Sequence, residues 1–383
     1  MTRLKNCHNF HDFRTLAKKR LPGPIFHYID GGSDDESTYR RNTAAFESCD
    51  LVPSVLAGVK DVDLSVTVMG QKLDMPVYCS PTALQRLFHH QGERAVANAA
   101  EKFGTLFGVS SLGTVSIEEI AKQINSPQVY QFYFHKDRGL NRAMMERAKE
   151  AGVQVMMLTV DSITGGNRER DLRTGFSIPF QLNLSGILQF LIKPMWGINY
   201  VTHEKFRLPQ LDEHIDMSAG ATSIGDYFTN MLEPSMNWDD VAEMVKFWDG
   251  EFCLKGVMSR EDARRAVDIG CTGIVISNHG GRQLDGSRSS FDQLAEIVEE
   301  VGDEIDVLFD SGVQRGTHVL KALSLGAKAV GIGRMYLYPL AAAGQSGVER
   351  ALGLMRAEIE RDMKLMGKTS IDQLSGDNLR FRC

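Results

Sequence analysis

The 383-residue sequence has no CxxC pair, no surplus of basic residues and no unbroken apolar run long enough to cross a membrane. Its six cysteines are scattered, at positions 7, 49, 79, 253, 271 and 383, which fits reduced thiols better than a disulfide framework or a zinc site. A formal charge of -6 gives no overall attraction to nucleic acid. We therefore expect no metal site and no nucleic-acid partner.

The amino-terminal residues MTRLKNCH lack the apolar core of a secretion signal, so we expect a cytoplasmic protein. The most apolar segment, 176–200, is broken by two prolines and a lysine, and falls short of the roughly 20 residues of a spanning helix. Trp196 and Tyr200 beside Lys193 favour a membrane interface. Two interpretations stay open: peripheral contact with the inner face of the cell membrane, or a loop packed on the protein's own core or on another subunit.

Short apolar runs alternate with helix-like segments, a pattern typical of βα units around a parallel sheet. The eight apolar runs are residues 76–80, 105–109, 128–132, 154–160, 252–255, 273–277, 306–309 and 329–332. The helix-like segments include 92–103, 116–123, 140–151, 259–269, 291–301 and 317–325. Ser116 and Ser259, each followed by acidic residues, are expected to cap two of these helices.

Eight such units predict a TIM (β/α)8 barrel of the α/β class. Length alone would also allow two domains, but barrels often occupy this much sequence as one unit. We therefore expect one domain over residues 1–383. Residues 1–75 would form a helical N-terminal cap segment, and 176–235 a long loop inserted after the fourth strand.

Polar, small or charged residues follow every predicted strand, at the end where a TIM barrel has its active site. In chain order they are Pro81 to Ala83, Ser110 and Ser111, Tyr133, Asp161, Lys255 and Gly256, Asn278 and His279, Asp310 to Gly312, and Gly333 and Arg334. The last two loops, DSGVQRG and GIGR, are rich in glycine, and barrels bind phosphate through backbone N–H groups at this place. A phosphate-bearing ligand is therefore expected.

The segment SNHGGRQLDG, residues 277–286, combines a base with an anion-binding group. Histidine is the side chain that exchanges a proton near neutral pH, here His279. Arg282 can bind a carboxylate through two parallel hydrogen bonds. The pair suits a small acid substrate, although a capped strand end with a satisfied histidine would give the same local pattern.

These residues resemble the FMN-dependent L-2-hydroxy acid dehydrogenase and oxidase family, which includes glycolate oxidase, L-lactate dehydrogenase and mandelate dehydrogenase. The resemblance covers residues 9–370 and depends mainly on SNHGGRQLDG. HYIDGG, PTA, QFY, TVD, GNRE and DSG support it, and FWDG and AAGQSGV are most similar to the bacterial respiratory L-lactate dehydrogenases. It implies oxidation of a lactate-like 2-hydroxy acid to the 2-oxo acid with FMN as cofactor. It also implies a quinone or oxygen as electron acceptor, and a homo-oligomer.

The resemblance implies a catalytic set that removes a substrate proton and holds the substrate's carboxylate and hydroxyl: His279, Asp161, Tyr133, Arg282, Arg168 and Tyr28. His279 would be the base, and a hydrogen bond to Asp161 would stabilise its protonated form. Arg168 and Arg282 would bind the carboxylate. The proton could leave the hydroxyl, with hydride transfer to the flavin, or Cα, with a carbanion, and the residues do not choose between these routes.

The resemblance also implies the residues that contact FMN: Pro81, Thr82, Ala83, Ser110, Gln131, Thr159, Lys255, Ser277, Asp310, Gly312, Gly333 and Arg334. Lys255 would stabilise the negative charge of the reduced ring. Asp310 would reach the ribityl chain, and the last three residues would hold the phosphate.

Two positions depart from the family pattern. Gln314 stands where an arginine usually contributes to the phosphate site, and Arg315 could replace that charge. Leu112 stands where several oxidases carry a tryptophan, so a larger or unusual 2-hydroxy acid, even a peptide, stays open as substrate. Ala83 is compatible with oxidase or dehydrogenase. From another class, a phosphate-binding barrel without redox function is the remaining alternative.

Overall fold

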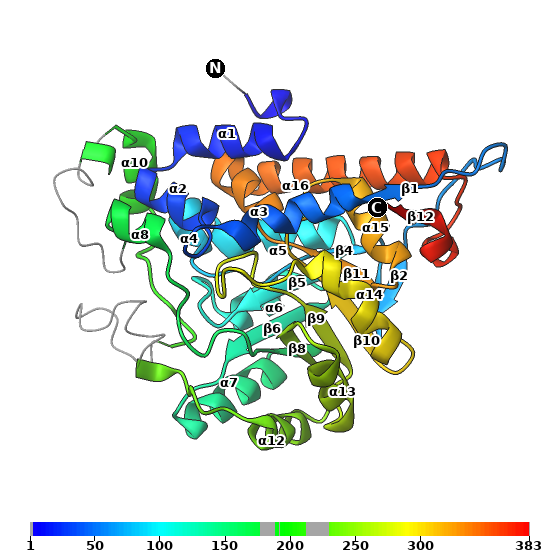
Figure 1. Cartoon of the computed structure of the whole chain (residues 1–383). Helices are drawn as coiled ribbons and strands as arrows, with labels where there is room; N and C mark the ends of the chain where they lie inside the picture. Colours follow the sequence, from blue (N-terminus) through cyan, green and yellow to red (C-terminus); the bar gives the residue numbers. More distant parts are fainter. Residues whose placement is uncertain (1–2, 177–187, 191, 212–229, 383) are drawn as a thin grey trace.

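The computed structural model describes residues 3–176, 188–190, 192–211 and 230–382, and its centre is a closed barrel of eight parallel strands (Figure 1). Around the barrel the strands are β4 (Val77–Cys79), β5 (Phe107–Ser110), β6 (Gln128–Tyr133), β7 (Val155–Thr159), β8 (Glu251–Val257), β9 (Gly273–Ile276), β10 (Asp306–Phe309) and β11 (Ala329–Ile332). Pairing of β11 with β4 closes the ring. Each of the eight predicted strands overlaps one of these, so the prediction of a TIM barrel is confirmed.

Helices follow the strands and surround the barrel (Figure 1). They are α5 (Gly92–Lys102), α6 (Ile117–Gln123), α7 (Arg138–Glu150), α12 (Trp238–Trp248), α13 (Arg260–Asp268), α14 (Ser290–Val301), α15 (Gly316–Ser324) and α16 (Arg334–Leu365). The six predicted helical segments are present. As predicted, the Ser116 and Ser259 side chains accept hydrogen bonds from backbone N–H groups of α6 and α13. Helices α12 and α16 were not predicted.

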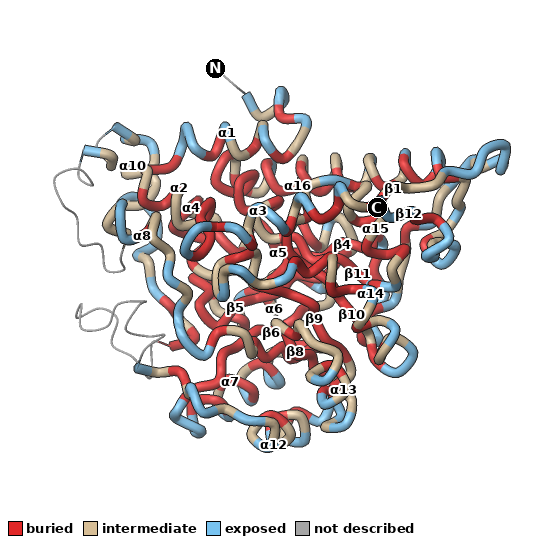
Figure 2. Tube along the Cα trace, in the orientation of Figure 1, coloured by how far each residue is buried: buried red, intermediate tan, exposed pale blue. Residues whose placement is uncertain are grey.

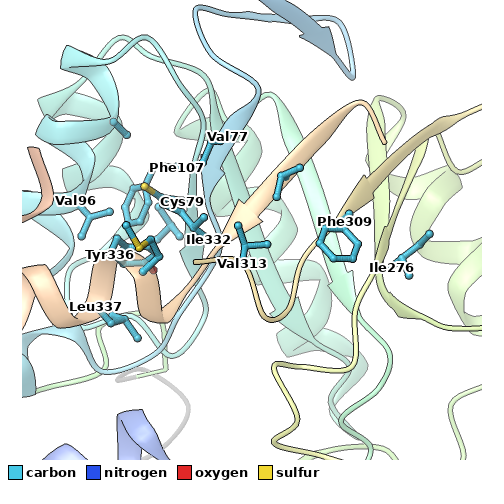
Figure 3. Packing of buried hydrophobic residues seen from close by; sticks show 14 of the residues in the cluster. Val77, Cys79, Val96, Phe107, Ile276, Phe309, Val313, Ile332, Tyr336 and Leu337 are labelled. Atoms are coloured by element: carbon cyan, nitrogen blue, oxygen red, sulfur yellow. The ribbon is translucent and has the colours of Figure 1, made fainter. Parts of the chain in front are cut away.

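Successive strand residues point to opposite faces of the sheet, so the barrel has two buried apolar layers, one inside it and one between the strands and the helices. On β7, Met156 and Leu158 face the surrounding helices, whereas Val155 and Met157 face the barrel interior. Figure 2 shows the buried chain concentrated in the barrel and the inner sides of its helices. Figure 3 shows part of the outer layer, where strand residues meet residues of α5 and α16.

A hairpin closes the amino end of the barrel. It consists of β2 (Val66–Val68) and β3 (Gln71–Leu73), and its apolar residues belong to the interior cluster. The backbone N–H of Met69 donates to the carboxylate of Asp306, the first residue of β10. The hairpin leaves the opposite end of the barrel, where the strands end, for a ligand.

The N-terminal segment lies over the end of the barrel where α16 begins and contains α1 (Phe10–Arg20), α2 (Gly23–Asp30) and α3 (Ser37–Ala44). Helix α1 packs along α16, and α2 along α8 (Glu169–Thr174), as Figure 1 shows. Strand β1 (Cys49–Leu51) pairs with β12 (Leu379–Phe381) near the carboxyl terminus. The remaining short elements are α4 (Gln85–Phe88), α10 (Pro194–Thr202) and the 3-10 helices η1 (Leu4–Asn6), η2 (Ala45–Ser48), η4 (Ile371–Gln373) and η5 (Gly376–Asn378).

Half of the predicted inserted loop, 176–235, lies outside the described residues, and the described half contains a helix over residues 194–202. Within the described part of the chain, no helix is long and apolar enough to cross a membrane. The same residues contain no cluster of three His, Cys, Asp or Glu side chains able to hold a metal ion.

Asp30, only 1% exposed, ties the N-terminal segment to the rest of the molecule. Its carboxylate accepts hydrogen bonds from Arg14 of α1 (2.5 and 2.8 Å), Arg170 of α8 (2.9 Å) and the Tyr338 hydroxyl of α16 (2.6 Å). Burial acts to raise the pKa of Asp30, but the hydrogen bonds from Arg14 and Tyr338 outweigh it, so this pKa lies below its ordinary value. The carboxylate is thus held ionised in a buried network.

Replacing Asp30 with Asn should lower the free energy of unfolding by about 3–5 kcal/mol near neutral pH, because it removes the buried, charged acceptor to which Arg14, Arg170 and Tyr338 donate. Since the pKa of Asp30 is depressed in the folded protein, its contribution is fully present above about pH 4 and is lost as the pH falls through the folded value. Urea unfolding at several pH values measures this difference. Glu360→Gln, which breaks only the surface pair with Lys364, should cost about 0.5 kcal/mol or less. Equal losses in both variants would contradict a special role for Asp30.

Candidate active site

One pocket at the carboxyl ends of the strands brings together most of the predicted site residues. Its lining includes Tyr28, Pro81, Thr82, Ala83, Ser110, Gln131, Tyr133, Thr159, Arg168, Lys255, His279, Arg282, Asp310, Gly312, Gly333 and Arg334. Asp161 and Ser277 lie directly behind it, where they hydrogen-bond His279 and Lys255. Residues from all eight strand ends therefore meet in one place.

The histidine of the pocket is paired with a carboxylate. His279 Nδ1 lies 3.0 Å from Asp161 Oδ1, which leaves Nε2 as the ring nitrogen available to a ligand. Burial acts to raise the pKa of Asp161, but the charge of His279 and its hydrogen bond, with the charge of Lys255, hold this pKa below its ordinary value. His279 itself has a φ of +58°, a left-handed conformation that is strained for a residue with a side chain. Such strain is common at functional sites.

Two arginines flank the ring of Tyr28. The guanidinium carbons of Arg282 and Arg168 lie 4.9 and 5.4 Å from its centre. Arg168 pairs with Asp171 at 2.9 Å, whereas Arg282 donates to the backbone carbonyls of Tyr28 and Gly31, and no described carboxylate lies within ion-pair distance of it. Burial, aided by the charge of Arg168, lowers the pKa of Arg282 to about 10, so it stays charged at neutral pH. This side of the pocket favours an anion.

Tyr133, on the last position of β6, supplies a neutral donor beside these charges. Burial, with the nearby negative charge of Asp161, raises the pKa of its hydroxyl. The hydroxyl therefore keeps its proton and can donate a hydrogen bond to a ligand oxygen.

A polar wall runs across three adjacent strands. Ser110 Oγ donates to Gln131 Oε1, and Gln131 Nε2 donates to Thr159 Oγ1, each at 2.9 Å. Beside this wall, Lys255 is only 5% exposed; its Nζ donates to Ser277 Oγ at 3.1 Å and lies 3.5 Å from Asp310. Lysine is seldom buried unless it is paired, so the wall and its cation fit the polar edge of a planar ring.

At the other end of the pocket, two backbone segments approach each other closely, and the groups there favour an anion. Gly312 has a φ of +80°, and a Cβ there would lie 2.3 Å from the carbonyl oxygen of Asn42. Helix α16 begins at Arg334, which lines the pocket, and its N-cap residue, a glycine, provides no side-chain hydrogen bond to it. The N-terminus of a helix is a favourable place for phosphate. Arg334 also donates to carbonyls at the carboxyl end of α2, those of Ile29 and Gly31, and so holds α2 against this end.

The two positions near the expected phosphate behave differently. Gln314 lines the pocket and its amide donates to the Thr43 hydroxyl at 3.2 Å. Arg315 does not line the pocket and pairs with Glu358 at 2.8 Å. In this structure Arg315 therefore does not replace the charge that Gln314 lacks.

Several lining residues were not found from the sequence. They include Tyr39, Asn42 and Thr43 of α3 and Phe88 of α4, and Phe176 stacks on Tyr28 at 4.5 Å between ring centres. None of these carries a local signal, because only folding brings them to the pocket. Ser162, which hydrogen-bonds Asp161 at 2.8 Å, could have been found, since it directly follows a predicted catalytic carboxylate.

Taken together, the donors fit a ligand with a polar planar ring at one end and a phosphate at the other, beside a smaller anionic substrate. The wall Ser110–Gln131–Thr159 and buried Lys255 meet the ring edge. The glycine backbone at Gly312 and Gly333 and the start of α16 meet the phosphate. FMN has this shape and chemistry.

Comparison with known proteins gives the same picture. A family described as FMN-dependent dehydrogenase matches residues 17–381. An L-lactate dehydrogenase of Alcaligenes faecalis is 39% identical over 372 residues, covering 96% of this chain and 97% of that protein. One of Xanthomonas campestris pv. campestris (strain 8004) is 40% identical over 372 residues, covering 96% and 95%.

Solved structures are similar over nearly the whole chain. The monotopic membrane protein (S)-mandelate dehydrogenase has 34% identity and a TM-score of 0.93, covering 98% of this chain and all (100%) of that one. A putative lactate oxidase of Pediococcus acidilactici has 32% identity and a TM-score of 0.84, covering 98% and 95%.

Proposed function

This chain belongs to the FMN-dependent dehydrogenase family, and we propose that it oxidises a small, lactate-like L-2-hydroxy acid to the 2-oxo acid. The observation that carries the proposal is the meeting of the His279–Asp161 pair with Arg168 and Arg282 in one pocket. A base and an anion-binding pair are the groups that a hydroxy acid requires. The L-lactate dehydrogenase relatives support the substrate. The family and the FMN dependence predicted from the sequence are confirmed.

In this proposal the substrate carboxylate binds between Arg168 and Arg282, and Tyr28 touches it. Tyr133 donates a hydrogen bond to the substrate oxygen. His279 Nε2 takes the proton, from the hydroxyl or from Cα, and Asp161 stabilises the resulting imidazolium. FMN, when bound, accepts the two electrons of the oxidation.

The cofactor residues have separate tasks in the proposal. Backbone and side-chain groups along the ring hold its polar edge, and these are Pro81, Thr82, Ala83, Ser110, Gln131 and Thr159. Lys255, supported by Ser277, places a positive charge beside the ring and stabilises its reduced form. Asp310 reaches the ribityl chain. Gly312, Gly333 and Arg334 hold the phosphate.

A larger 2-hydroxy acid is the second candidate. Leu112 is buried and lines the pocket, and the structural similarity to (S)-mandelate dehydrogenase supports room for an aryl substituent. These residues do not distinguish a quinone from oxygen as the electron acceptor. The homo-oligomer and the cytoplasmic location also stay predictions.

We also propose peripheral contact with a membrane through α10 and the residues before it. The apolar side chains of Ile192, Met195, Ile198 and Val201 are 52–79% exposed. Similarity to a monotopic membrane protein supports the proposal.

Basic residues lie beside this apolar surface. Lys193 donates to the backbone carbonyls of Lys18 and Lys19 in the last turn of α1, so several cations are close together. Anionic lipids attract such clusters.

Trp196 is not positioned as an anchor at a membrane interface would be. It is half-buried, stacks on Tyr200 at 5.1 Å and donates to the carbonyl of Leu87 at 2.7 Å. The indole therefore attaches α10 to the protein, and the exposed aliphatic residues form the candidate membrane surface.

The central experiment is anaerobic mixing of the yellow, FMN-loaded protein with L-lactate. We expect the flavin absorbance to bleach in the wild type. In His279→Gln the rate should fall by about 10²–10⁴-fold, because a positioned general base is lost, while the phosphate end and FMN retention are unchanged. Rapid-mixing absorbance measures both rates. A loss below about tenfold would mean that another residue is the base.

Gln314→Arg should tighten FMN binding by about tenfold or more, because it adds a charge-assisted hydrogen bond to the phosphate. Titration of the apo-protein with FMN gives the two dissociation constants. Arg315→Gln is the matched control and should have no effect, since Arg315 pairs with Glu358 outside the pocket. Equal constants for Gln314→Arg and the wild type would show that the phosphate is already fully satisfied.

The double variant Ile198→Glu/Val201→Glu should lose binding to anionic phospholipid vesicles in a flotation assay, because it places charges on the apolar surface of α10. Bleaching by L-lactate should be unchanged. Leu365→Glu, an exposed apolar position on α16, is the control and should still float. A wild-type protein that does not bind vesicles would refute the membrane proposal.

A further inference from the structure

Ser162 follows Asp161 in the chain, and the proposed contacts to substrate and cofactor do not use it. Its side chain is buried, with 3% of the residue exposed. Its Oγ donates to Asp161 Oδ1 at 2.8 Å and lies 3.4 Å from His279 Nδ1. His279 Nδ1 lies 3.0 Å from the same carboxylate oxygen. Two donors therefore converge on one oxygen atom behind the base.

The orientation of the Asp161 carboxylate depends on such contacts, because the terminal torsion of an aspartate is broad and does not fix its own rotation. Gly256 leaves room for the carboxylate on one side, because a Cβ there would lie 2.6 Å from Asp161 Cβ and 2.9 Å from Oδ2. On the other side, Ser162 holds Oδ1. The glycine lets the carboxylate reach this position, and the serine hydrogen bond holds it there, facing His279.

Other charges also face this group. Lys255 of β8 stabilises the ionised carboxylate through its charge. Tyr133 of β6 lies close enough for the charge of Asp161 to affect its pKa, which burial raises first, and Arg168 and Arg282 act on the same tyrosine. Among the described residues, only Ser162 and His279 donate to Oδ1 from their side chains.

We propose that Ser162 is a positioning residue for the base: its hydroxyl orients the Asp161 carboxylate and draws part of the negative charge away from His279. The carboxylate then stabilises the imidazolium less than it would alone. As a result His279 stays unprotonated, and able to accept the substrate proton, down to lower pH. The inference rests on the proposed role of His279 as the base.

The test is the pH dependence of kcat/KM for L-lactate in the FMN-loaded protein. In Ser162→Ala no hydroxyl donates to the carboxylate, so the carboxylate stabilises the protonated ring of His279 more strongly. The ring should then be protonated at higher pH. The acid limb, the pH at which kcat/KM falls on the acid side of the profile, should move upward by about 0.4–1 pH unit. This shift corresponds to the free energy of one hydrogen bond. Above the limb, kcat should fall by about two- to tenfold, because the carboxylate is less well oriented.

Two further variants separate the effect of the hydroxyl's hydrogen bond from the effect of the volume that the side chain fills. Ser162→Cys has nearly the same size but is a weak donor, so it should behave like the alanine variant. Ser162→Thr keeps the hydroxyl and should restore the wild-type acid limb. If the threonine variant does not fold, the alanine and cysteine variants still carry the test.

A second readout does not depend on activity. The NMR signal of the His279 ring, followed against pH in the FMN-loaded protein without substrate, should show protonation at higher pH in Ser162→Ala than in the wild type. If L-lactate and other 2-hydroxy acids fail to bleach the flavin while this shift is present, the proposed function fails, and only the effect of Ser162 on the Asp161–His279 pair stands. An unchanged ring titration and an unchanged acid limb would overturn the role of Ser162. So would an equal loss of rate at every pH.

Discussion

The structure depends on the closure of the parallel sheet. Strands β4 and β11 are separated by some 250 residues of chain, yet Val77 pairs with Val330 and Cys79 with Ile332. Without that pairing each of these strands would expose unpaired backbone groups at an edge. Closure gives every strand two neighbours, and the parallel pairing directs all eight carboxyl ends to the same side. The pocket exists because of it: residues that follow different strands can meet only when the ring is closed.

Charge decides what this pocket can hold. Five cations or potential cations line it, Lys255, Arg168, Arg282, Arg334 and His279, and among the described carboxylates Asp161, Asp171 and Asp310 pair with them. A positive charge is costly in a buried place, and burial, aided by the charge of Arg168, lowers the pKa of Arg282. A bound carboxylate and a bound phosphate would relieve that cost. The site is therefore complementary to anions at both ends, and the neutral wall between them suits a flavin ring.

The N-terminal segment completes the site from outside the barrel. Asp30 joins α2 to α1, α8 and α16 through a buried network, and Arg334 holds the carboxyl end of α2 from the start of α16. Tyr28 lies on α2, so these contacts also place its ring between the two arginines. On α3, Asn42 exchanges two side-chain hydrogen bonds of 2.7 Å with Asn278, the residue before His279. The loop that carries the base is thus held from both sides.

The sequence by itself determined the eight strands, most of the helices and the residues at the strand ends, because these depend on local patterns: apolar runs, N-caps, and polar groups where a strand stops. The pair His279 and Arg282 was also evident, since both lie in one short loop. Only the tertiary structure decided that Arg315 turns to Glu358, that Trp196 packs inward on Leu87, and that Ser162 shares an oxygen of Asp161 with His279. Each of these depends on partners brought close by folding. A side chain's direction is set by the neighbour that satisfies its charge or hydrogen bond, and local sequence does not specify that neighbour.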